Sequence, residues 1–447
     1  MYQNILILPD GREISSGAEA SIRSLKLREL VNSGTDLTIG ACCADLLEAT
    51  VLAQTLELRA GDDIRLVKAH QGNRIPIGVY TLEAPVRSGP HTYRLTAYDH
   101  MAKLDKDLTP WLKNLTGWPY GIQDLAALVC ARCGVEYRWS ESLPNEDFLI
   151  EKWSESAVTG RKILGWLGEI ACRFVHADPQ GAIGFGWYTD SGKHLTHTGT
   201  GYYLGGSLRY DGYRVHPIEA VQLRRETGLF PEADPDANSY ILTGNPILSA
   251  CREETLAALL DTIALELSQA RYTPGSVSAL SDPTVRAGSI LHVVDAAGQE
   301  IALWVMEKTS TGQRDTYTCT GNPRRNSVAA LHSKSASQKA AESALQTDAR
   351  LTRQALFQKL TAGAAEGLVL ENGSLWLNPG YLLPGEILAD LTLTGRLFPG
   401  EALVVDALPE ESVPGQLILL REEPAQGWAR LQPYIGAEER SNHDDST

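Results

Sequence analysis

Residues 286–319, RAGSILHVVDAAGQEIALWVMEKTSTGQRDTYTC, contain the pattern that decides the fold. Two apolar runs, 290–294 and 301–306, are separated by a turn at Ala296-Ala297-Gly298, and after a polar turn a third run ends at Cys319. Apolar runs broken by glycine and polar turns are typical of hairpins. The stretch therefore predicts a three-stranded meander.

A second stretch, residues 59–99, has the same order: RAGDDIRLVKAHQGNRIPIGVYTLEAPVRSGPHTYRLTAYD. With small gaps, the alignment pairs Arg59-Ala60-Gly61 with Arg286-Ala287-Gly288, Gly72 with Gly298, Ile75 and Ile77 with Ile301 and Leu303, Val79 with Val305, and Thr92-Tyr93 with Thr316-Tyr317. Two unrelated copies of a common β motif are the alternative. The shared RAG and TY at matching places, on either side of a different kind of segment, favour a duplication.

The chain of 447 residues is long enough for about three domains. Its net charge of −15 argues against sequence-specific nucleic-acid binding, which uses a basic face. No apolar run approaches the roughly 20 residues that span a bilayer, so we expect no integral membrane association. The opening MYQNILILPDG lacks the basic segment of a signal peptide. Seven scattered cysteines imply no disulfide framework and favour a reducing cytosol.

The pattern along the chain predicts a mixed α+β fold that is mainly β. Residues 1–100 have enough strand-like runs, including 24–30, 38–43 and 50–58, to close a small barrel or sandwich. Residues 101–214 form an α+β middle domain, with a short helix at 99–107, helices at 121–133 and 157–173, and a loop at 190–206. Residues 215–325 form a second β domain that contains a helix at 253–271.

The remaining residues change in character. Residues 326–363 are rich in Ala, Ser, Gln and Lys and predict a long helix or a flexible linker, with a thin apolar seam at Leu345, Ala349, Thr352, Leu356 and Leu360. Short β runs bounded by Gly or Pro predict a small β domain at 364–436. The polar residues 437–447 predict a disordered tail.

Cysteine and histidine pairs are the sharpest candidates for a site. Cys130 and Cys133 form a CxxC, but structural zinc needs four ligands, and the pair closes a helix rather than opening one. We interpret them as helix-end core residues. His194 and His197 could share a metal, but no carboxylate partner is indicated and HExxH is absent. We interpret them as loop histidines.

Other patterns also favour structural roles. Residues 199–206, GTGYYLGG, have the wrong spacing for a dinucleotide loop and predict turns around a short strand. No GxSxG or GxxxxGK[ST] occurs. Six middle-region tryptophans favour core packing over sugar stacking: Trp111, Trp118, Trp139, Trp153, Trp166 and Trp187. We therefore predict no enzyme and no catalytic, cofactor-binding or metal residues.

The order of elements over residues 1–325 resembles the baseplate-hub and tail-tip proteins of tailed phages and contractile injection systems. The resemblance rests on 58–66 (LRAGDDIRL), on 96–99 (TAYD) followed by 101–104 (MAKL), on the helix and strand at 161–175 with the Gly181 turn, and on Gly321-Asn322-Pro323. Residues 326–447 do not share it.

The resemblance implies a homotrimer in which each chain supplies two similar tube-type β-barrel domains around the α+β insertion. Six such domains would form a pseudo-sixfold face for the hexameric tail tube or distal tail protein, and the opposite face would carry a threefold spike or fibre. It further implies a tape measure protein as partner, assembly in the host cytoplasm and a place in the virion.

Two other functions stay open from the sequence. A tail-associated cell-wall hydrolase would need a cleft with a carboxylate of raised pKa or a bound metal. A glycan-binding tail adhesin would use the β domain at 364–436 as its receptor module.

Overall fold

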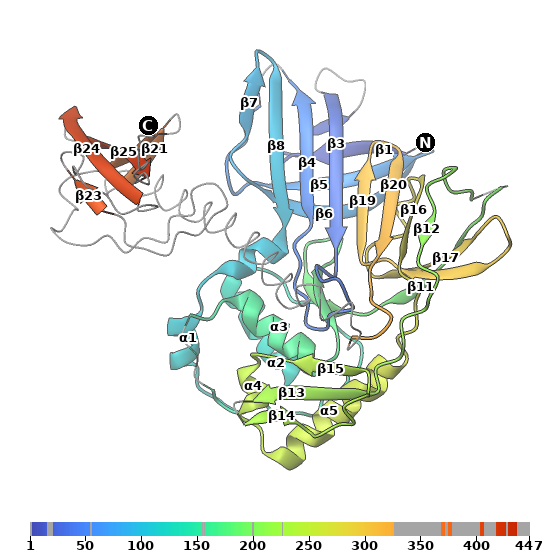
Figure 1. The fold of residues 1–447 in the computed structure, drawn as a ribbon. Helices are drawn as coiled ribbons and strands as arrows, with labels where there is room; N and C mark the ends of the chain where they lie inside the picture. Colours follow the sequence, from blue (N-terminus) through green and yellow to red (C-terminus); the bar gives the residue numbers. More distant parts are fainter. Residues whose placement is uncertain are drawn as a thin grey trace, which may run out of the picture. The chain divides into compact units, whose positions relative to one another are not determined.

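The computed structural model describes residues 2–15, 21–53, 56–153, 155, 157–198, 201–225 and 227–325, and five strands between 368 and 435 (Figure 1). The chain divides into two compact units, Met1–Ala341 and Glu342–Thr447. The expected linker helix at 326–363 and the expected tail at 437–447 lie outside the described residues. The chain is mainly β with a few helices, as the sequence predicts.

The first β region, residues 2–99, consists of eight strands whose apolar side chains enclose one core. In β3 the buried positions alternate, so Leu25, Leu27 and Glu29 all face inward. The runs predicted at 38–43 and 50–58 are wrong as strands of their own, because β4 covers only the start of the latter. The strands are β1 (Gln3–Ile7), β2 (Glu13–Ser15), β3 (Ser21–Leu30), β4 (Leu46–Leu52), β5 (Asp63–His70), β6 (Asn73–Leu82), β7 (Val86–Gly89) and β8 (Thr92–Asp99).

The middle region confirms the predicted helices. Gly134, at φ +79°, ends α2, and Thr159 caps α3 by accepting a hydrogen bond from the Lys162 N–H. The predicted loop at 190–206 is wrong over 190–195, because Thr189–Leu195 pairs as a strand with a segment one hundred residues later. The elements are η1 (His100–Asp105), α1 (Thr109–Asn114), α2 (Ile122–Cys133), α3 (Gly160–Ile170), β9 (Phe174–Ala177), β10 (Ile183–Gly186), β11 (Thr189–Leu195) and β12 (Arg209–Tyr210).

The last part of the described body contains the predicted helix at 253–271 as α5, whose buried stripe of leucines packs against β13. Residues 275–319, with β16 to β20, are called the second β region below. The elements are β13 (Ala220–Arg225), β14 (Gly228–Phe230), β15 (Ser239–Leu242), α4 (Pro246–Ser249), α5 (Glu253–Ser268), β16 (Gly275–Leu280), β17 (Ser289–Val294), β18 (Glu300–Trp304), β19 (Glu307–Thr311) and β20 (Arg314–Cys319).

One large sheet joins the two β regions. Its strands follow the order β12-β16-β20-β19-β3-β4-β8-β6-β5-β1-β2, with β7 beside β8, and the junction is the antiparallel pair β19–β3 (Figure 1). The two expected β-barrel domains are not confirmed: no sheet closes among the described residues, and β3 uses one of its edges to pair with the second region. At the far end of the path β2 packs near β3 without pairing.

The expected three-stranded meander at 286–319 is also corrected. It is two hairpins in two sheets, because β17 and β18 form a three-stranded sheet with β11, whereas β19 and β20 belong to the large sheet. The crossing lies at Val305 and Met306. The Val305 N–H donates to Ser289 O at 2.8 Å, and the next N–H, of Met306, donates to Thr318 O at 2.9 Å. Val305 thus bonds to the three-stranded sheet, and Met306 bonds to the large sheet.

The second unit contains five described strands in the order β21-β22-β25-β24-β23, with β23 and β24 parallel. They are β21 (Leu368–Glu371), β22 (Ser374–Leu377), β23 (Leu403–Val405), β24 (Leu417–Ala425) and β25 (Trp428–Ile435). Across all described residues, the helices are too short or too polar to cross a bilayer.

Candidate functional site: the seam between the two β regions

The two copies of Arg-Ala-Gly make the same turn. Gly61 and Gly288 have φ of +91° and +90°, a conformation that glycine adopts without strain. Gly61 N–H donates to Leu82 O and Gly288 N–H donates to Val305 O, each at 2.8 Å. The return bonds, Leu82 N–H to Asp62 O and Val305 N–H to Ser289 O, are also 2.8 Å. The sequence repeat is therefore a structural repeat at this turn.

These hydrogen bonds correct the alignment of the strands that follow. Val305 corresponds to Leu82, not to Val79. Because Glu83 N–H bonds to Thr96 O at 2.8 Å, as Met306 bonds to Thr318, Thr92-Tyr93 corresponds to Arg314-Asp315 rather than to Thr316-Tyr317. The first hairpin is longer, and a bulge between Leu66 and Val67 absorbs part of the excess.

Two opposite charges face each other across the β19–β3 junction. Lys308 stands directly opposite Glu29, with 3.4 Å between Lys308 Nζ and Glu29 Oε2, and both side chains are at most 3% exposed. Lys308 Nζ also lies 3.3 Å from Asp315 Oδ2 on β20 and donates to Val285 O at 2.6 Å. A charge buried this deeply is stable only when paired and hydrogen-bonded.

Two further cations complete the group. Arg286 Nε donates to Glu29 Oε1 at 2.6 Å. Lys68 Nζ, contributed by β5, donates to Ser281 Oγ at 2.6 Å and lies 3.8 Å from Asp315 Oδ1. We call Glu29, Lys68, Arg286, Lys308 and Asp315 the buried ion cluster. Its members come from both β regions, so the cluster ties one region to the other.

Burial and charge act on the pKa values in opposite directions here. Burial alone would raise the pKa of Glu29, but Lys308 and Arg286 outweigh it and hold that pKa below its ordinary value. Burial lowers the pKa of Lys68, against the attraction of Asp315. Burial, with Asp99 and Glu29 close by, raises the pKa of Asp45 well above its ordinary value. The site thus holds oppositely charged pairs beside a carboxyl group whose pKa is raised.

A cleft of about 590 Å³ opens beside the cluster. Glu29, Asp45 and Arg286 line its charged wall. His176 lines it too, and burial, with Arg286 adding to it, lowers the pKa of that imidazole to about 4. Five aromatic residues also line the cleft: Trp139, Phe174, Phe185, Trp187 and Tyr188.

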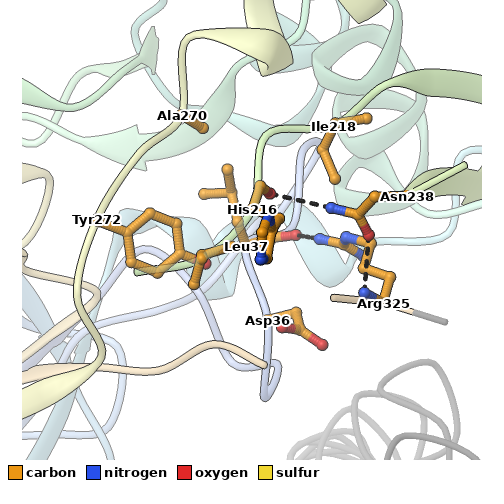
Figure 2. A pocket seen from close by; sticks show the side chains of 9 residues that line it. Asp36, Leu37, His216, Ile218, Asn238, Ala270, Tyr272 and Arg325 are labelled. Carbon is orange, nitrogen blue, oxygen red and sulfur yellow. Dashed lines mark hydrogen bonds between the residues drawn. The ribbon is translucent and has the colours of Figure 1, made fainter. Parts of the chain in front are cut away.

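The end of the described body, residues 320–325, is clamped by side chains from three segments; we call it the exit strap. The Arg325 guanidinium donates to Leu37 O, and the Arg325 N–H donates to Asn238 Oδ1 at 2.8 Å (Figure 2). The guanidinium also lies 4.1 Å above the ring of Tyr240. Asn238 in turn donates to His216 O at 2.9 Å. These contacts fix the position of the strap against the rest of the described body.

The sequence TGNP occurs twice, at 243–246 and at 320–323, and serves two different purposes. In the exit strap, Asn322 holds Asp36 with two hydrogen bonds of 2.6 Å, one from its N–H to Oδ1 and one from its amide to Oδ2. In the earlier copy, Asn245 is fully buried, caps α4 and donates to Glu169 Oε2 at 2.8 Å. The copy at 243–246 is therefore not a second strap.

The cysteine pair lies where the sequence interpretation puts it. Cys130 is buried on α2, Cys133 ends that helix partly buried, and both thiols are free. Burial raises the pKa of Cys130 to about 12 and that of Cys133 to about 11. A redox-active thiol has a lowered pKa, so these values match the structural interpretation.

His194 and His197, the histidine pair considered from the sequence, have different neighbours in the structure. His197 packs beside the ring of Tyr203, 5.8 Å between centroids. His194 lies on β11 and meets His292 and Glu300, which the sequence did not single out. These three are the residues among those described that could hold a metal ion. The signal was present, because His292 and Glu300 flank the hairpin turn at 295–299, but nothing in the sequence pairs β11 with that hairpin.

The other sequence candidates are structural. In the described part of 199–206, Tyr202 and Tyr203 make isolated bridges between turns, as expected. The six tryptophans pack against the main core, as predicted, and Trp153 contacts Trp118 and Trp166 edge to face. The buried ion cluster was missed. Its signal is a lysine inside an apolar strand, as in Leu66-Val67-Lys68-Ala69.

No family model matches the chain, and no curated protein matches it in sequence. Among solved structures it is similar to a tail protein from Neisseria meningitidis MC58, with 12% identity, a TM-score of 0.47, and coverage of 72% of this chain and 96% of that one. It is also similar to the prophage MuSo2 43 kDa tail protein from Shewanella oneidensis, with 11% identity, a TM-score of 0.45, and coverage of 71% of this chain and 98% of that one. A chain of the phage P2 baseplate in its activated conformation with Ca matches with 10% identity, a TM-score of 0.27, and coverage of 72% of this chain and 100% of that one. These neighbours are phage tail and baseplate proteins.

Proposed function

We propose that this chain is a structural, non-enzymatic protein of a phage tail, located at the baseplate hub or tail tip, and that three copies form the hub. The observation that carries the proposal is the structural repeat: each chain contains two β regions with the same Arg-Ala-Gly turn and the same exchange of backbone hydrogen bonds. Three chains then present six such units, which is how a trimer meets a sixfold partner.

The seam gives this proposal its mechanical basis. A sixfold face needs the two β regions of one chain held at a fixed angle, and the β19–β3 pair with the buried ion cluster supplies a rigid joint. The proposed partners are the tail tube or distal tail protein and the tape measure protein on the sixfold face, and a spike or fibre on the threefold face. The proposed location is the virion, after assembly in the host cytoplasm.

The oligomeric state tests the proposal. Light scattering on the purified full chain should give about 146 kDa, three times the 48.6 kDa of one chain. Electron micrographs of the same sample, averaged without imposed symmetry, should show a ring with six similar lobes. A monomer or dimer at every concentration, with and without a tail-tube protein, would refute the trimeric hub.

A second candidate, the cell-wall hydrolase, is favoured by one observation. Glu29 and Asp45 both line the cleft, and their environments move their pKa values in opposite directions, a pattern found in acid–base pairs. A zymogram on peptidoglycan tests it. Clearing by the wild type that is lost in Asp45→Asn would support a hydrolase, since the amide oxygen still accepts the hydrogen bond that Leu30 N–H gives to Asp45 Oδ1 at 2.9 Å. Absence of clearing by the wild type would remove this candidate.

A further inference from the structure

One side-chain cluster on the three-stranded sheet has the composition of a metal site. His194 on β11 stands opposite His292 on β17 in the parallel ladder, and their rings are stacked with centroids 4.9 Å apart. Glu300 begins β18, the next strand of this sheet. One ligand atom from each of the three lies within 4.8 Å of the other two. Three different strands thus deliver three ligands to one place.

The distances suit a small ion. His292 Nδ1 lies 3.0 Å from Glu300 Oε1, and His194 Nδ1 lies 4.0 Å from the same oxygen. A tetrahedral ion with bonds of about 2.0–2.2 Å holds its ligands roughly 3.3–3.6 Å apart. The His292–Glu300 contact must lengthen and the His194–Glu300 contact must shorten by about half an ångström each, together with a tilt of the two rings. His194 and Glu300 are 57% and 58% exposed, so both side chains are free to make it.

A fourth residue orients the least exposed ligand. His292 Nε2 lies 3.3 Å from Asp190 Oδ1, and that carboxylate also accepts the Gly192 N–H at 2.8 Å. A carboxylate on the far nitrogen fixes the ring tautomer and turns the near nitrogen towards an ion. Here the near nitrogen is Nδ1, the atom that faces Glu300. The geometry is therefore that of a ligand with its outer-shell support.

The hairpin that carries two of the ligands is itself held in place. Asp295, at its tip, accepts the Ala297 and Gln299 N–H groups at 2.8 Å each and the Tyr210 hydroxyl at 2.7 Å. Glu300 pairs with Val294 as the last rung of the β17–β18 ladder. The framework is therefore organised before any ion binds, which lowers the ordering cost of binding.

We propose that His194, His292 and Glu300 bind one divalent transition-metal ion of the Zn²⁺ class, with a water on the open position. Imidazole nitrogens select this class, whereas Ca²⁺ and Mg²⁺ require oxygen ligands. The ion joins β11, at the end of the middle region, to the β17–β18 hairpin of the second β region.

The test is a Zn²⁺ titration of the untagged full chain at pH 7.5, with Co²⁺ absorption as a second readout. The expected result is one ion per chain, a tetrahedral Co²⁺ spectrum and a raised Tm. His194→Ala should lose more than the roughly 10–100-fold in affinity that an outer-shell change such as Asp190→Asn causes. His197→Ala, three residues away and outside the cluster, is the matched control and should bind as the wild type does.

Several results of this titration would overturn the proposal. Absence of Zn²⁺ binding by the wild type overturns the proposal, as does binding that survives in His194→Ala or is lost in His197→Ala. Binding of Ca²⁺ in preference to Zn²⁺ overturns the assigned metal class. Circular dichroism checks that each variant is folded. If His194→Ala is not, Glu300→Gln removes a ligand from an exposed side chain and must show the same loss.

Discussion

Removing the charge of Asp315 while keeping its shape tests whether the buried ion cluster holds the two β regions together. Asp315→Asn is isosteric, and the amide oxygen still accepts the Asp282 N–H that now binds Oδ2 at 3.0 Å. What disappears is the negative charge that faces Lys68 at 3.8 Å and Lys308 at 3.3 Å. Breaking one partner out of a buried pair typically costs about 3–5 kcal/mol.

The structure sets a ceiling on this cost and gives it a pH dependence. Burial already lowers the pKa of Lys68 from 10.5, and Asp315 is the main group opposing that shift. Without Asp315, Lys68 avoids being buried as an unpaired charge by losing its proton. The free energy of deprotonating a lysine with its ordinary pKa is about 4.8 kcal/mol at pH 7 and about 2 kcal/mol at pH 9, and this sets the ceiling. In this range the unfolded chain binds the extra proton, so the stability of the variant rises with pH, by up to about 1.4 kcal/mol per pH unit.

Urea unfolding of the full chain at pH 7, 8 and 9, followed by tryptophan fluorescence, measures the effect. The deficit of Asp315→Asn relative to the wild type should be about 3–5 kcal/mol at pH 7 and should shrink towards pH 9. Glu48→Gln is the control: its carboxylate is half exposed and lies 3.8 Å from Lys26, so it should change stability by less than about 0.5 kcal/mol at each pH. A deficit below about 1 kcal/mol, or one that does not shrink with pH, would refute the reasoning.

Three further predictions use the same unfolding assay. Gly61→Ala should cost about 1–3 kcal/mol because of the positive φ, and Gly288→Ala should cost more, because its new Cβ also meets an aromatic carbon at 2.9 Å; equal losses would contradict this. His176, whose pKa falls from 6.5 to about 4 on folding, binds a proton more readily when unfolded. Between pH 6.5 and 4 acidification should therefore remove up to about 3 kcal/mol of stability, and His176→Gln should flatten that part of the difference curve. Asn322→Ala should cost about 1–3 kcal/mol by leaving buried Asp36 short of one hydrogen bond, and limited proteolysis should cut the exit strap faster; unchanged cleavage would argue against the clamp.

The sequence predicts those elements whose signal is local. The leucine stripe of α5 repeats at helical spacing, and Gly134 stands where a helix end needs a left-handed residue. The Arg-Ala-Gly turn was recognisable twice because only glycine adopts its φ without strain. In each case the physical constraint acts within a few residues, so the amino-acid order records it.

Strand partners could not be predicted in the same way. Alternation along β3 indicates which side chains face inward, but not that its open edge pairs with β19, whose Glu307 is 279 residues away from Arg28. The metal-site candidate depends on a parallel pairing of β11 with β17 that no local pattern encodes. The change of sheet between Val305 and Met306 likewise has no signal in an uninterrupted apolar run.

The charges at the seam make the pairing of β3 with β19 specific, because they fail in any other register. Glu29 faces Lys308 on the buried side of this ladder, and on the exposed side Arg28 donates two hydrogen bonds, of 2.9 and 2.8 Å, to Glu307. A slip of two residues would keep every side chain on its face, yet it would leave the Lys308 ammonium opposite Leu27 or Val31 instead of Glu29. An apolar seam would tolerate that slip, since leucines and valines pack alike in both registers. Buried ion pairs contribute little stability compared with apolar residues, so their value here lies in fixing one register. In the hub that we propose, six units would have to meet a sixfold tube, so the angle between the two β regions would have to be the same in every chain. A joint with a single allowed register would provide that angle.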